Sequence, residues 1–235
     1  MFDLIAFDAD DTLWHNESNF QATEKQFAQL LGPNHDEELV RKRLFETESR
    51  NLRHFGYGVK GFILSMIETA IELTDGEIRG SDIHQIIAWG REMLQAPVEL
   101  LDGVRETVEV LSRNYRLMLL TKGDLFDQES KLARSGMGEL FSAVEIVSEK
   151  NVETYRAIMK RHGVEPRQFL MIGNSLRSDV LPALEAGATA IHVPYYTTWA
   201  HEQVPDELIA GREYARFESL AELPAWLHAT TAADR

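Results

Sequence analysis

The sequence predicts an α/β protein in which a doubly wound parallel sheet carries a small inserted α-helical domain. After residue 97, short and continuous apolar runs alternate with helical stretches, which is typical of parallel strands covered by helices on both faces. Between residues 16 and 95 the apolar spacing is helical throughout, which is typical of a small bundle with its own core. A further apolar run at residues 3–7 places one strand before the bundle.

The inserted bundle is predicted to contain four amphipathic helices. We expect the first to begin with a capping box formed by Ser18 and Gln21, and the fourth to begin with a cap at Ser81. In each helix the apolar residues follow the spacing of one helical face. They are Phe20, Phe27, Leu30 and Leu31; Val40, Leu44, Leu52 and Phe55; Val59, Phe62, Ile63, Met66, Ile67, Ala70 and Ile71; and Ile83, Ile86, Ile87, Met93 and Leu94.

The later part of the chain supplies the other strands of the sheet. Apolar runs predict strands at Leu117–Leu120, Val144–Val147, Phe169–Ile172 and Ala190–Val193. Helical stretches lie between and around them, at residues 104–114, 126–136, 152–162 and 178–186. With residues 3–7, the sheet has at least five strands. The predicted domains are therefore an α/β core of residues 1–14 and 96–235 and a helical insertion of residues 15–95.

Composition and charge exclude several classes of function. Among 235 residues, 38 are acidic and 24 are Lys or Arg, and the net charge of −14 argues against binding to nucleic acid or to an anionic membrane. Cysteine is absent, which excludes disulfides and cysteine nucleophiles and fits a reducing compartment. The sequence shows neither a leader segment nor an apolar run of the ~18 residues that a membrane span needs. We therefore expect a cytoplasmic protein.

The first predicted strand runs directly into Asp8-Ala9-Asp10-Asp11-Thr12. Carboxylates crowded at the end of a buried strand repel one another unless a cation or a lysine compensates their charge, so this motif predicts a metal site. Because Asp8 and Asp10 are two residues apart, one can attack while the other gives or takes a proton. An isolated Asp-x-Asp also occurs in solvated turns, so the motif needs support from elsewhere in the chain.

Support comes from the ends of the other predicted strands. In an open parallel sheet the ligand site lies beyond the carboxyl ends of the strands. There the sequence places Thr121-Lys122-Gly123-Asp124, then Lys150, and then the run Gly173-Asn174-Ser175-Leu176-Arg177-Ser178-Asp179. A hydroxyl, a lysine and acidic groups at one edge are what a metal-assisted phosphate site requires.

These four motifs, in this order, resemble those of the haloacid dehalogenase-like superfamily, in particular its members with a helical cap inserted after the first motif. The resemblance covers essentially the whole chain and implies a Rossmann-like core. It implies that Asp8 is a nucleophile that forms an aspartyl-phosphate and that Asp10 is the general acid and base. Thr121 would bind the transferring phosphoryl group, and Lys150 would neutralise it and orient Asp8.

The resemblance also implies a Mg²⁺ ion, held by Asp8, by the carbonyl of Asp10 and by the last acidic motif. The N–H groups after Asp8 and after Thr121 are natural donors to phosphate, which adds Lys122 to the phosphate-binding residues, through its amide more than its ammonium. Family members usually carry glycine at position 11 and aspartate at position 174. Asn174 brings a carbonyl oxygen but no charge, so we expect weaker metal binding, with Asp179 in support or partly compensating.

The resulting hypothesis is a Mg²⁺-dependent phosphatase for a small phosphorylated metabolite, acting as a monomer or a homodimer. The alternatives are a 2-haloacid dehalogenase, a sugar-phosphate mutase, and a phosphate-binding protein without turnover. A halide leaves without a proton, so Asp10 favours phosphoryl transfer over dehalogenation. The scaffold hosts many substrates, and the sequence does not select among them.

Overall fold

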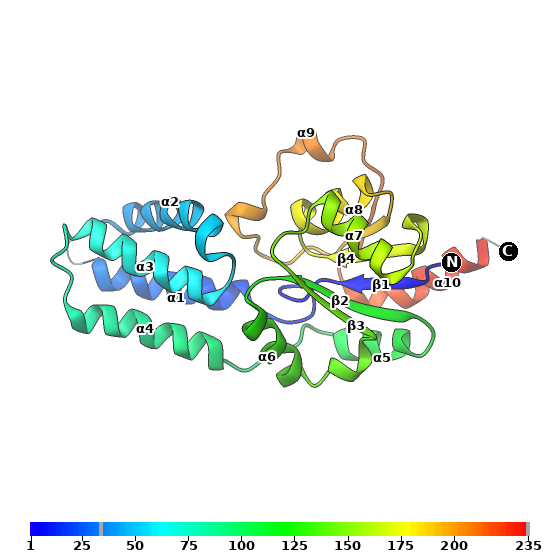
Figure 1. The fold of residues 1–235 in the computed structure, drawn as a ribbon, viewed down its shortest axis with the longest axis horizontal. Coiled ribbons are helices and arrows are strands. Elements are labelled where there is room, and N and C mark those ends of the chain that lie inside the picture. Colours follow the sequence, from blue (N-terminus) through cyan, green and yellow to red (C-terminus); the bar gives the residue numbers. More distant parts are fainter. Residues whose placement is uncertain (33–34, 234–235) are drawn as a thin grey trace. The chain divides into compact units, whose positions relative to one another are not determined.

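The computed structural model of the chain describes residues 1–32 and 35–233 (Figure 1). The chain forms two compact units. The first, here the sheet unit, comprises Met1–Glu17, Val98–Lys122 and Ser130–Arg235. The second, here the helical unit, comprises Ser18–Pro97 and Gly123–Glu129.

The sheet unit is built on six parallel strands in the order β3-β2-β1-β4-β5-β6. They are β1 (Leu4–Phe7), β2 (Arg116–Lys122), β3 (Ala143–Val147), β4 (Phe169–Gly173), β5 (Thr189–His192) and β6 (Ala215–Arg216). The predicted α/β class with a parallel sheet is confirmed. The sixth strand was not predicted because it has only two residues, too few to show a periodic pattern.

Helices cover both faces of the sheet (Figure 1). The side chains of Ile5 and Phe7 pack with α5 (Val104–Ser112) and α10 (Leu223–Ala233). Those of Leu4 and Ala6 pack on the other face with α7 (Val152–His162) and α8 (Leu181–Glu185). Because successive strand residues point to opposite faces and both faces are covered, the strand is apolar at every position.

The helical unit contains α1 (Glu17–Leu31), α2 (Glu37–Phe55), α3 (Val59–Leu73) and α4 (Gly80–Gln95). α1 starts at the last residue of the sheet unit. The four helices share a core to which each contributes buried apolar side chains, among them Phe27, Leu44, Met66 and Ile86. Two further helices follow the strands of the sheet: α6 (Leu125–Ser135) after β2 and α9 (Asp206–Ile209) after β5.

The strand order fixes where the predicted motifs meet. β1 lies between β2 and β4, and Phe7 is in register with Leu119 and Ile172. The backbone N–H of Asp8 donates to the carbonyl of Ile172 at 2.9 Å. The chain adds β2 and β3 on one side of β1 and then β4, β5 and β6 on the other, so the carboxyl end of β1 lies at the switch point where ligands bind in such folds.

The start of α1 differs from the sequence prediction. α1 begins at Glu17, so Ser18 lies inside its first turn and the predicted capping box is wrong. The Ser81 cap is wrong for the same reason, since α4 begins at Gly80. At the start of α1 the cap is Asp11, whose Oδ1 accepts from the N–H groups of Asn16 (2.9 Å) and Glu17 (3.0 Å).

The backbone conformation of Asp11 explains why glycine is usual at this position in the family and why aspartate can replace it. Its φ of 60° lies in the left-handed region, which glycine adopts freely and which aspartate tolerates better than most residues. The side chain is only 7% exposed, and burial raises the pKa of Asp11 to about 7, although the N–H groups of Glu17 and Asn16 lower it.

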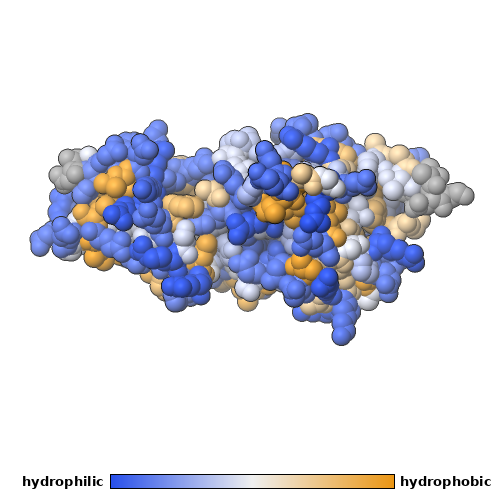
Figure 2. Space-filling view, turned by 90° about the horizontal axis from the view of Figure 1, so that it is seen from above, coloured by the Kyte–Doolittle hydropathy of each residue, from blue (hydrophilic) through white to orange (hydrophobic). Residues whose placement is uncertain are grey.

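No helix among residues 1–32 and 35–233 is long and apolar enough to span a membrane. Hydrophilic residues cover most of the face seen in Figure 2, and the hydrophobic residues on it form separate patches.

We predict that Asp11→Asn changes the pH dependence of stability. The buried carboxyl keeps its proton up to about pH 7, whereas its ordinary pKa is 3.8. The stability that the retained proton gives the wild type is therefore complete below pH 3.8 and is lost as pH rises through 7. Relative to the wild type, the variant should gain up to ~4 kcal/mol between pH 4 and pH 8. Urea unfolding of the wild type and the variant across this pH range measures the effect. Asp102→Asn, which replaces an exposed aspartate, is the control. If the free energy of unfolding varied with pH in the same way in all three proteins, the prediction would be contradicted.

Candidate active site

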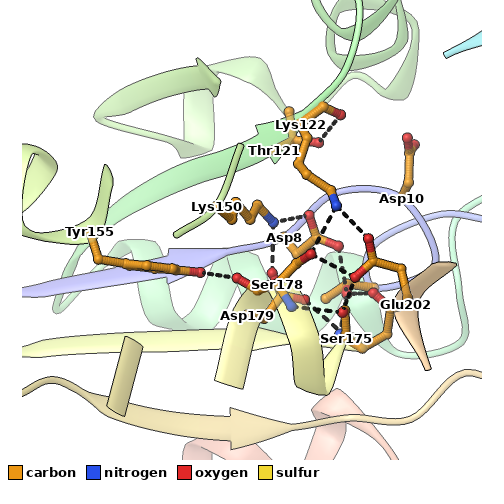
Figure 3. A network of polar contacts seen from close by, with 12 residues as sticks. Asp8, Asp10, Thr121, Lys122, Lys150, Tyr155, Ser175, Ser178, Asp179 and Glu202 are labelled. Carbon is orange, nitrogen blue, oxygen red and sulfur yellow. Dashed lines mark hydrogen bonds and ion pairs between the residues drawn. The ribbon is translucent and has the colours of Figure 1, made fainter. Parts of the chain in front are cut away.

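The centre of the candidate site is a buried lysine between two carboxylates (Figure 3). Lys150 Nζ donates to Asp8 Oδ1 at 2.5 Å and to Asp179 Oδ1 at 2.7 Å. The side chains of Lys150 and Asp179 are 2% and 0% exposed, and that of Asp8 is 11% exposed. An ammonium ion buried to this degree is stable only with opposite charges in contact.

Local structure fixes each member of this group. Lys150 lies between β3 and α7, and the next residue, Asn151, caps α7 by accepting from the N–H of Thr154 at 2.9 Å. Asp179 lies in a π-helical turn, Leu176–Val180, and its Oδ2 accepts from the N–H of Ser175 at 3.0 Å. Such turns are frequent at functional sites.

Glycine is required at position 173, where β4 ends. A Cβ atom there would lie 2.1 Å from Asp179 Oδ2, far inside van der Waals contact. The absence of a side chain lets the Asp179 carboxylate pack directly against the end of the strand, which explains the Gly that opens the last motif.

Burial and charge shift the pKa values of this group in a defined way. Burial raises the pKa of Asp8 to about 7, and the nearby Asp179 adds to this, while Lys150 lowers it. Burial by itself lowers the pKa of Lys150, but Asp179 and Asp8 outweigh burial and raise it above its ordinary value. Lys150 is therefore charged across the physiological range.

Asp10 is held apart from this group. Trp14 Nε1 donates to Asp10 Oδ1 at 2.7 Å. Lys131 Nζ, in the part of α6 that belongs to the sheet unit, donates to both Asp10 oxygens at 3.0 and 3.1 Å. In Figure 3 the Asp10 carboxylate points away from Asp8 and Lys150. The structure thus places Asp8 and Asp10 in separate surroundings.

Oxygen atoms suited to a divalent cation gather around Thr12. Its Oγ1 lies 3.4 Å from Asp8 Oδ2 and 3.3 Å from Asn174 Oδ1, and it accepts from the N–H of Asn174 at 3.0 Å. Magnesium prefers such carboxylate and carbonyl oxygens. Among residues 1–32 and 35–233, no three His, Cys, Asp or Glu side chains form a metal-binding group, so any set here must include amide or backbone oxygens.

The structure separates Asp179 from the other predicted metal ligands. Both of its carboxylate oxygens accept from protein donors, Lys150 and Ser175. The side-chain oxygen of Asn174 contacts Thr12 Oγ1, and the same Thr12 oxygen contacts Asp8 Oδ2. Asn174 therefore lies on the Asp8 side of Thr12, whereas Asp179 lies against Lys150.

Thr121 and Lys122 lie where β2 ends. Thr121 is 1% exposed. Lys122 Nζ donates to Ser178 Oγ at 2.8 Å and to the carboxylate of Glu202. Glu202 also accepts from the hydroxyls of Ser175 and Ser178, and these contacts outweigh its burial and lower its pKa. The Lys122 ammonium is thus occupied by Glu202, which leaves its amide as the group suited to phosphate.

Three residues at this site were not predicted to act there: Trp14 as a donor, Lys131 and Glu202. The sequence carried no signal for Lys131, because its contact with Asp10 joins α6 to a motif 121 residues earlier in the chain. Glu202 had none either, since it lies in a 3₁₀ turn, Ala200–Glu202, within an irregular segment far from the motifs.

The fold and the site together define a hydrolase of the haloacid dehalogenase type. Residues 2–187 match the family model of the haloacid dehalogenase-like hydrolases. The chain belongs to this family. The resemblance seen in the sequence motifs is thereby confirmed.

Known relatives are consistent with this membership. The crystal structure of a haloacid dehalogenase-like family hydrolase from Xanthomonas campestris is 40% identical, with a TM-score of 0.87, over 99% of this chain and 93% of that one. The glyceraldehyde 3-phosphate phosphatase of Methanothermobacter thermautotrophicus is 33% identical over 37% of this chain and 40% of its own. The N-acylneuraminate-9-phosphatase of Mus musculus is 29% identical over 68% of this chain and 65% of its own. The chain thus spans less than two thirds of either phosphatase.

We predict that Lys150→Met lowers the free energy of unfolding by about 3 kcal/mol, because it leaves the buried carboxylates Asp8 and Asp179 without a counter-charge. Chemical denaturation at pH 8 measures the loss. Lys160→Met, on the exposed side of α7, is the matched control and should stay within about 0.5 kcal/mol of the wild type. Equal effects of the two substitutions would show that Lys150 does not compensate the carboxylates.

Proposed function

We propose that this hydrolase is a Mg²⁺-dependent phosphatase that cleaves a small phosphate monoester through an aspartyl-phosphate on Asp8. The observation that carries the proposal is the pair of separate carboxylates after β1. Asp8 is fixed by the buried Lys150, and Asp10 is held by its own donors, Lys131 and Trp14. Covalent phosphoryl transfer needs one carboxylate that attacks and another that moves a proton.

In the first step a carboxylate oxygen of Asp8 attacks phosphorus, and the bond from phosphorus to the ester oxygen breaks. Asp10 gives its proton to that leaving oxygen, which departs as an alcohol. In the second step Asp10 takes a proton from water as the water oxygen attacks phosphorus. The bond from phosphorus to Asp8 breaks, orthophosphate leaves, and both aspartates return to their starting state.

The chain's own residues stabilise the charge that develops on the phosphoryl oxygens. Lys150 brings a fixed ammonium to Asp8, Thr121 brings a hydroxyl, and the N–H groups that follow Asp8 and Thr121 would be further donors at the strand ends. Such groups are effective because they are already in place in a site largely closed to water. Since Glu202 binds the Lys122 ammonium, Lys122 contributes through its amide.

Magnesium would be held by Asp8, by the backbone carbonyl of Asp10 and by the side-chain oxygen of Asn174. The bound ion would neutralise charge on the phosphoryl oxygens. Asp179 would orient Lys150 rather than bind the ion, because both of its oxygens are already engaged by Lys150 and Ser175. With only one carboxylate among the three ligands, we expect weak binding of the ion.

A small phosphorylated metabolite is the substrate class that the relatives support, since two of them are phosphatases whose names specify glyceraldehyde 3-phosphate and N-acylneuraminate 9-phosphate. Dehalogenation is the competing activity on this scaffold. It gains no support from Asp10, because a halide leaves without a proton.

The test is phosphate release from a panel of monoesters that includes both of these compounds, with and without Mg²⁺. We expect release that requires Mg²⁺, is abolished by EDTA and falls at least ~1,000-fold in Asp8→Asn. Asp102→Asn, an exposed aspartate of the sheet unit, should leave it unchanged. Chloride release from 2-chloropropionate without phosphate release from any ester would instead identify a dehalogenase.

A further inference from the structure

Each aspartate that the proposed reaction uses is paired with a different lysine. Lys150, which follows β3, contacts Asp8. Lys131, from α6, contacts Asp10. The second lysine belongs to none of the four motifs, and the proposed chemistry assigns it no part.

Lys131 contacts three oxygen atoms of two residues. Its Nζ has Asp10 Oδ1 at 3.0 Å, Asp10 Oδ2 at 3.1 Å and Asn16 Oδ1 at 2.8 Å. An ammonium group has three N–H bonds, so it can donate to all three of these acceptors at once. Its side chain is 12% exposed and that of Asp10 is 22% exposed, so solvent screens the pair only partly.

The other donor to Asp10 is equally fixed. Trp14 is 1% exposed and lies in the hydrophobic core of the sheet unit, which immobilises its indole ring. Its N–H reaches Asp10 Oδ1 at 2.7 Å. With Lys131 bridging both oxygens and Trp14 donating to one, rotation of the carboxylate about its χ angles would break at least one contact.

We propose that Lys131 is the positioning residue for Asp10: it holds both carboxylate oxygens so that the proton moved in each step is given and taken at one fixed place. This inference rests on the proposed function of Asp10. Hydrogen bonds between an ammonium and a carboxylate are among the strongest in proteins, and a misplacement of about 1 Å can slow a positioned reaction ~100-fold. Lys131 itself touches none of the reacting atoms.

The first readout requires no turnover. The ¹⁵N–¹H resonance of the Trp14 indole depends on the position of the carboxylate that accepts the indole hydrogen bond. The spectrum of Trp14→Phe, which lacks this resonance, identifies it. We expect a shifted resonance in Lys131→Met, and in Lys131→Gln, whose amide is neutral and whose side chain is shorter than that of lysine. Lys131→Arg should keep the wild-type position, because a guanidinium also bridges two carboxylate oxygens. Arg134→Met removes a charge from the exposed side of the same helix and should cause no shift.

The second readout is kinetic. In Lys131→Met we expect kcat for an alkyl phosphate to fall ~10- to 100-fold, within the range of general acid–base contributions, with KM changed less than twofold. Lys131→Arg should recover most of this loss. With p-nitrophenyl phosphate, whose leaving group needs no proton, the first step should proceed in Lys131→Met while the second slows, which gives a burst of nitrophenol.

Two outcomes overturn the inference. An unshifted Trp14 resonance in folded Lys131→Met and Lys131→Gln would show that Lys131 does not fix Asp10. An inhibition constant for inorganic phosphate raised more than tenfold with kcat intact would make Lys131 a phosphate ligand instead. Failure of the proposed function is distinguishable, because it would appear as absent phosphate release in the wild type while the Trp14 resonance still decides the role of Lys131.

Discussion

The ammonium of Lys150 between Asp8 and Asp179 is the interaction on which the rest of the site depends. Two carboxylates and one ammonium are buried there, and each carboxylate has Lys150 as its counter-charge. The order of the strands makes this possible: β1 lies between β2 and β4, so residues that follow β1, β3 and β4 reach one point. Gly173 completes the arrangement, because any side chain there would displace Asp179.

Asp8 and Asp10 lie in different surroundings although they are only two residues apart. Asp8 is nearly closed to solvent and its pKa is raised by burial, whereas Asp10 is more exposed and lies against Lys131 and Trp14. Different surroundings for two carboxylates are what allow one to attack and the other to move a proton. The separate lysines give a physical basis for the proposed division between Asp8 and Asp10.

The two departures from the usual family pattern have different consequences. Asp11 keeps the left-handed backbone that glycine would adopt, and adds a cap for the start of α1. Asn174 keeps an oxygen near Asp8 but lacks a charge. Glu202 brings a carboxylate to the last motif, yet its oxygens face Lys122, Ser175 and Ser178. It anchors its irregular segment to the strand ends and holds the Lys122 side chain.

The sequence by itself determined the class of fold and the parallel sheet, because strands buried on both faces must be apolar at every position and helices must be amphipathic. It also determined which motifs follow which strands. It misplaced the caps at Ser18 and Ser81, since a serine before an apolar stripe fits several positions in a first turn. Only the tertiary structure decided that Asp11 caps α1, that both oxygens of Asp179 are engaged, and that Lys131 and Glu202 join the site. The contacts of Lys131 with Asp10, of Glu202 with Lys122 and of Lys150 with Asp179 link residues far apart in the chain, and local patterns carry no information about such pairs.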